Sequence, residues 1–212
     1  MLGQIGDAPS LTALAKLART EDTVLLGEIV TALSYSPNRE ADQRLLEIAA
    51  SGKTAAKIAG AQSARRMVIG PKGFGDVTSA ARLDFADAML ARVLDPHLVS
   101  YLGNIHEARA LRTLASCLRQ GVQSAAESMI RSAEGMSKLP PADAQIAATA
   151  LKDVIEFIEV NKLRGGLEKH MSKDDNYVGW KALQARAGKA LLKFHNPGAA
   201  PIKGFDYLEL NP

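Results

Sequence analysis

The most constraining feature of this sequence is a series of short apolar stripes with helical spacing, each ended by turn-forming residues. Within a stripe, apolar residues recur at steps of three and four, a spacing that predicts amphipathic helices. Four such stripes fall within residues 1–70, with breaks at residues 19–22, 37–38 and 51–52. Pro9 and Ser10 are start signals for the first helix, and Thr20 or Asp22 could cap the second.

The composition supports a helical chain. Alanine makes up about one residue in six, whereas aromatic residues make up 5%. Alanine is the strongest helix former, and strands favour the aromatic and β-branched residues. Because 47% of the residues are hydrophobic and the net charge is only +3, most of the chain is expected to fold. The predicted fold class is all-α.

The first helices recur along the chain. A shift of about thirty-one residues aligns Asp7 with Asn38, Leu14 with Leu45, and Leu17 with Ile48. A helix pair that recurs at thirty-odd residues is typical of an α-solenoid, in which neighbouring units bury each other's apolar stripes.

The join between the first helices resembles a known family. Leu2-Gly3-Gln4-Ile5-Gly6-Asp7-Ala8-Pro9, followed by Leu11, Leu14 and Leu17, is similar to the junction between two HEAT repeats. The resemblance covers residues 1–70 and implies a helical-repeat fold of the kind that serves as a protein-binding scaffold. The second unit departs from the pattern, because Asn38 replaces the aspartate and its second helix carries Arg65 and Arg66.

Two interpretations of the chain start stay open. If residues 2–6 end a repeat, the chain is the C-terminal piece of a longer solenoid and Met1 is an added initiator. The alternative is a natural start with a frayed first turn.

Residues 71–196 are predicted to form longer helices. The strongest pattern runs from His106 to Ala133 as a single helix with a heptad seam, interrupted by Gly121. The first helix of this part is expected to end at residues 95–96, and the last to place Trp180 on an apolar face. This part is either a continuation of the solenoid or a small bundle of antiparallel helices, and residues 197–212 are expected to be a coil tail.

Searches for catalytic and metal-binding patterns favour structural roles. Cys117 lies within a regular helix pattern, where a buried thiol is expected, and the four histidines are scattered singly. Glu156 lies four residues after Lys152, the spacing of an exposed ion pair on a helix. The glycine-rich segment 70–76 follows a helix rather than a strand, which favours a connector over a phosphate loop. We expect no cofactor and no metal, and the interpretation leans away from an enzyme.

The predicted function is a non-enzymatic scaffold for protein–protein interaction. Nucleic-acid binding, in the manner of DNA-repair glycosylases with HEAT-like architecture, is the alternative, and oligomerisation through the seams or the tail is a third. The candidate interaction residues are charged side chains on predicted helices or in the glycine-rich segment: Glu28, Arg65, Arg66, Lys72, Arg109, Arg112 and Arg119.

The sequence says less about where the chain resides. A single cysteine is compatible with a reducing compartment, so the cytoplasm is favoured. No stretch approaches the roughly eighteen consecutive apolar residues of a membrane-spanning helix.

Overall fold

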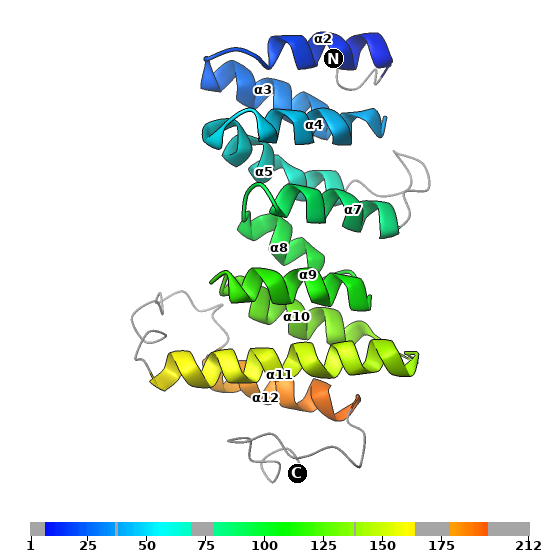
Figure 1. The fold of residues 1–212 in the computed structure, drawn as a ribbon, viewed down its shortest axis with the longest axis vertical. Helices are drawn as coiled ribbons and strands as arrows, with labels where there is room; N and C mark the ends of the chain where they lie inside the picture. Colours follow the sequence, from blue (N-terminus) through cyan, green and yellow to red (C-terminus); the bar gives the residue numbers. More distant parts are fainter. Residues whose placement is uncertain (1–6, 37, 69–78, 138, 164–178, 195–212) are drawn as a thin grey trace. The chain divides into compact units, whose positions relative to one another are not determined.

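The computed structural model describes residues 7–36, 38–68, 79–137, 139–163 and 179–194. Ten α-helices and no strand occur in these ranges, so the protein has the predicted all-α fold (Figure 1). Contacts between Cα atoms divide the chain into two compact units, Met1–Tyr101 and Leu102–Pro212. The boundary predicted at residue 70 falls on residues outside the described ranges and stays a prediction, as does the tail.

The first unit is a stack of short helices. It contains α2 (Ala8–Leu17), α3 (Thr23–Ser34), α4 (Glu40–Ala50), α5 (Lys53–Val68) and α7 (Ser79–Leu90), and α8 (Pro96–Leu102) lies at its end. Each helix from α2 to α4 packs against the next helix and the next but one along the chain. The core of this unit is aliphatic for the most part, and Leu11, Leu33, Leu45 and Leu83 are fully buried in it.

The helix starts in this unit are set by short polar side chains. The Asp22 Oδ1 accepts hydrogen bonds from the backbone N–H groups of Val24 and Leu25, so Asp22 rather than Thr20 caps α3. Of the two start signals of the first helix, Pro9 lies in the first turn of α2, whereas the cap is Asp7, whose Oδ1 accepts a hydrogen bond from Ser10 N at 2.7 Å. Asp95 was expected to end a helix, but α7 ends at Leu90 and Asp95 caps α8.

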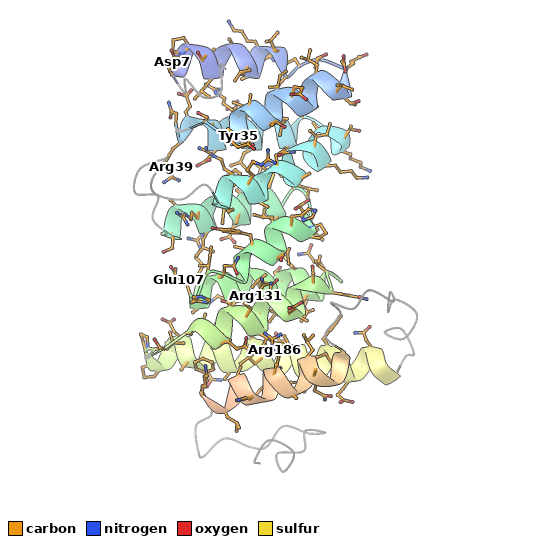
Figure 2. All side chains as sticks on the ribbon, turned by 180° about the vertical axis from the view of Figure 1, so that it is seen from behind. Asp7, Tyr35, Arg39, Glu107, Arg131 and Arg186 are labelled. Atoms are coloured by element: carbon orange, nitrogen blue, oxygen red, sulfur yellow. The ribbon has the colours of Figure 1, made fainter. Side chains whose placement is uncertain are left out.

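The described residues of the second unit form four helices: α9 (Ala108–Arg119), α10 (Ser124–Gly135), α11 (Pro141–Leu163) and α12 (Trp180–Leu192). It repeats the contact pattern of the first unit, since α9 packs on α10 and α11, and α10 packs on α11 and α12. Arg186 of α12, labelled in Figure 2, joins the second and fourth helices through a bidentate pair with Glu134 at 3.1 and 2.8 Å.

The predicted single helix over residues 106–133 is wrong. It is a hairpin of two twelve-residue helices, α9 and α10. The chain turns at Gly121, whose φ of +89° lies in the left-handed region that favours glycine. The hairpin removes one of the two long helices on which the bundle interpretation rested, and α11, with 23 residues, is the other.

Candidate functional site

The second unit carries a groove between α9 and α11. Two adjoining hollows, of about 370 and 430 Å³, lie along these helices and share Arg119 and Asp153. The first is lined by Leu111, Arg112, Ala115, Gln145, Ile146, Thr149 and Ala150 as well, and the second by Leu118, Gly121, Glu156, Phe157, Val160 and Asn161. The lining residues advance in the same direction on both helices, so α9 and α11 run parallel along the groove.

The floor of the groove is apolar. Leu111, Ala115, Leu118 and Ala150 belong to the buried core. The alanines are small, which leaves the hollow between the two helices. On the α11 side the apolar surface continues outward through Val160, which is 37% exposed.

The walls of the groove carry opposite charges. Because α9 buries its apolar residues on one side, Arg112 and Arg119 extend from the other side to the groove edge. Asp153 and Glu156 stand on the opposite wall. The groove therefore combines an apolar floor with a cationic and an anionic edge.

One ion pair crosses the groove where the two hollows meet. Arg119 Nη1 lies 3.2 Å from Asp153 Oδ2, and the side chains are 66% and 32% exposed. Burial raises the pKa of Asp153 above its ordinary value, and Glu156 adds to this effect while Arg119 opposes it. An exposed pair of this kind contributes little to stability, so a bound partner could replace it at small cost.

Two of the predicted interaction residues, Arg112 and Arg119, line this groove. Arg109 is exposed on the same helix but lies outside the lining, and it has its own contact in the structure. Glu28, Arg65 and Arg66 belong to the first unit, and Lys72 lies outside the described residues.

Arg66 is committed to contacts within the first unit. Its side chain is only 7% exposed, with Nε 2.5 Å from Asp42 Oδ1. It also donates to the backbone carbonyls of Ser36 and Asn38, the latter at 2.8 Å. Arg66 therefore fastens α5 to the turn between α3 and α4.

Arg65 stacks on an exposed aromatic side chain. Its guanidinium carbon lies 4.7 Å from the centre of the Tyr35 ring, and Tyr35, labelled in Figure 2, is 44% exposed. The neighbouring arginines 65 and 66 thus differ in their contacts, since Arg65 stacks on an exposed ring and Arg66 is held by an ion pair and hydrogen bonds.

The α11 wall was missed by sequence reasoning. Glu156 was assigned to an ion pair with Lys152, but neither side chain forms that pair among the described residues. Glu159 points elsewhere and accepts a hydrogen bond from Gln184 of α12 at 2.5 Å. A signal for this wall in the sequence is the apolar pair Phe157 and Val160, because these residues interrupt the otherwise polar side of the helix.

The described part of the chain offers no constellation for catalysis by metal or thiol. The predicted burial of Cys117 is confirmed, at 2% exposure. Within the ranges that the structure covers, no three histidine, cysteine or carboxylate side chains cluster to hold a metal ion, and no helix is long and apolar enough to cross a membrane.

Comparisons with family models, with curated proteins and with solved structures find no match to this chain.

Proposed function

We propose that the protein is a helical-repeat scaffold of HEAT-like type that binds a segment of another protein in the groove between α9 and α11. The observation that carries the proposal is the groove itself, with its buried apolar floor and its charged edges. Peptide sites on helical proteins commonly combine an apolar groove with flanking charges that fix the register of the ligand.

The charge of the groove favours protein over nucleic acid as the partner. A phosphate backbone requires several cations on one face, free of internal partners. Here Arg119 is paired with Asp153 of the opposite wall, and a second carboxylate, Glu156, lies on the same wall as Asp153. Mixed charges beside apolar surface suit a peptide, whose own side chains can be of both signs.

The proposal can be tested by selecting ligands and then blocking the groove. A phage-displayed library of random short peptides is selected on the immobilised full chain, and the enriched peptides are titrated by fluorescence anisotropy. Thr149→Trp places a bulky side chain at an exposed position in the first hollow. Ser116→Trp is the matched control, because Ser116 is exposed on α9 and outside the lining.

We expect Thr149→Trp to abolish binding of the enriched peptides and Ser116→Trp to leave it unchanged. Circular dichroism of both variants checks that the helices persist. Enrichment of no peptide, or peptides that bind both variants equally, would overturn the proposal.

A further inference from the structure

Arg112, the cation at one end of the groove, has no partner among the described residues. Arg112 is exposed and lines the first hollow, and its side chain makes no ion pair or hydrogen bond with the parts of the chain that are described. Arg119, about one helical turn beyond Ala115, differs because it is paired with Asp153. Arg112 is therefore the cation of the groove that can receive an external anion without breaking a contact.

The surroundings of Arg112 determine which anion fits. A guanidinium binds a carboxylate with two parallel hydrogen bonds, and such charge-assisted bonds are about twice as strong as neutral ones. Ala115 and Ala150 lie next to it with no side-chain atoms beyond Cβ, so an aliphatic side chain can fill the hollow beside the ion pair. Arg112 and the hollow together fit an acidic residue next to an apolar one.

The other end of the groove has the opposite charge. Glu156 is exposed beside Phe157 and Val160, and it forms no ion pair within the described ranges. Eleven residues of α11 separate Gln145, near Arg112, from Glu156, which corresponds to about 16 Å along the helix. A ligand with an acidic end and a basic end would therefore bind in one direction.

The shape of the site favours a helical ligand. Helices α9 and α11 satisfy their backbone groups internally, so they offer an extended peptide no backbone partners along the groove. A helix satisfies its own backbone and can pack its ridge of side chains between two parallel helices.

We infer that the groove binds an amphipathic helix of a partner protein. Beside its apolar stripe this helix carries a carboxylate that pairs with Arg112 and, about three turns away, a cation that lies near Glu156. This inference rests on the proposed function. It adds the chemistry and the direction of the ligand.

The test uses the peptides selected on the full chain. We expect an Asp or Glu one helical turn from a Leu, Ile or Phe in the enriched sequences. Arg112→Glu should weaken their binding at least about tenfold, since a hydrogen bond to a charged group contributes about 1.5–3 kcal/mol. Lys189→Glu is the matched control, because it makes the same change of charge at an exposed site on α12, outside the groove.

A charge swap keeps the test independent of folding. Replacing the peptide's acidic residue by lysine should restore binding to Arg112→Glu while weakening binding to the unaltered chain. Two outcomes would overturn the inference and leave the proposed function standing. In one, Thr149→Trp blocks the enriched peptides but they carry no acidic residue; in the other, they bind Arg112→Glu and Lys189→Glu equally. A dimer in light scattering that Arg112→Glu dissociates would identify a second copy as the occupant, and would also overturn it.

Discussion

At the scale of single residues, Gly121 decides the path of the chain in the second unit. Gly121 N donates to Leu118 O at 2.9 Å, and Val122 N donates to Cys117 O at 3.1 Å. This pair of bonds is the Schellman arrangement that ends a helix with a left-handed residue. Gly121→Ala should lower the free energy of unfolding by about 1–2 kcal/mol, the cost of a left-handed conformation for a residue with a Cβ. Urea unfolding followed by circular dichroism measures it.

Two further variants show whether conformation is the cause. Gly121→Asn should cost less than Gly121→Ala, because asparagine tolerates the left-handed region better. Gly27→Ala, inside α3, should stabilise by up to about 1 kcal/mol, since an added Cβ meets no atom within 4 Å and alanine favours the helix. An unchanged stability of Gly121→Ala would mean that the turn can form without the left-handed residue.

Asp153 gives a second prediction at this scale. Its pKa is raised from 3.8 in the folded chain, so the folded state keeps the proton to a higher pH than the unfolded state does. The free energy of unfolding therefore falls as pH rises from about 3.8 through the raised pKa. Asparagine cannot titrate, so the stability of Asp153→Asn relative to the unaltered chain should rise across that interval and then stay level.

The effect should be below about 1 kcal/mol, because the side chain is 32% exposed and solvent screens its charge. Urea unfolding of both chains at a series of pH values measures the difference between their free energies of unfolding. The other carboxylates are the same in both chains, so their titration cancels from this difference. A relative stability that falls as pH rises would show that Arg119 outweighs burial.

At the scale of helices, the sequence predicted the elements better than their connections. The apolar stripes located α3 and α4, and Asp22 marked a helix start because aspartate caps through a local bond that needs no tertiary context. Gly121 was misread because the steps of three and four continue across it, from Ala115 and Leu118 to Ala125 and Met129. A tight turn can keep the phase of a stripe, so periodicity alone does not separate one helix from two.

Arg66 shows how one side chain holds three elements together. Arg66→Met should lower the free energy of unfolding by about 3 kcal/mol, because it leaves the Asp42 carboxylate and two backbone carbonyls without the guanidinium. Arg65→Met is the matched control and should cost about 1 kcal/mol or less, the usual contribution of an exposed cation–π contact. Urea unfolding measures both, and equal losses would contradict the structural role given to Arg66.

At the scale of the molecule, the groove was only half predictable. Arg112 and Arg119 could be named from one helix, because residues at helical spacing share a side. The residues of the opposite wall, Asp153, Glu156 and Phe157, could not be named in this way. They face α9 only because α9 and α11, which are thirty-odd residues apart in the sequence, pack side by side in one particular alignment. Sequence periodicity fixes which side of a helix is buried, and the facing partner comes only with the tertiary structure.

The distribution of charge over the chain argues against duplex binding. The 26 lysines and arginines stand against 23 aspartates and glutamates, and the α11 wall of the groove is anionic. We expect fluorescence titration with a random DNA duplex to show no saturable binding at physiological salt. The matched variant Asp153→Lys with Glu156→Lys gives both walls of the groove positive charge, and it should gain binding that weakens steeply as salt rises, because each phosphate contact releases counterions. If the unaltered chain bound the duplex as tightly as the double variant and with the same dependence on salt, the acidic wall would not repel phosphate. Nucleic-acid binding would then be favoured over peptide binding.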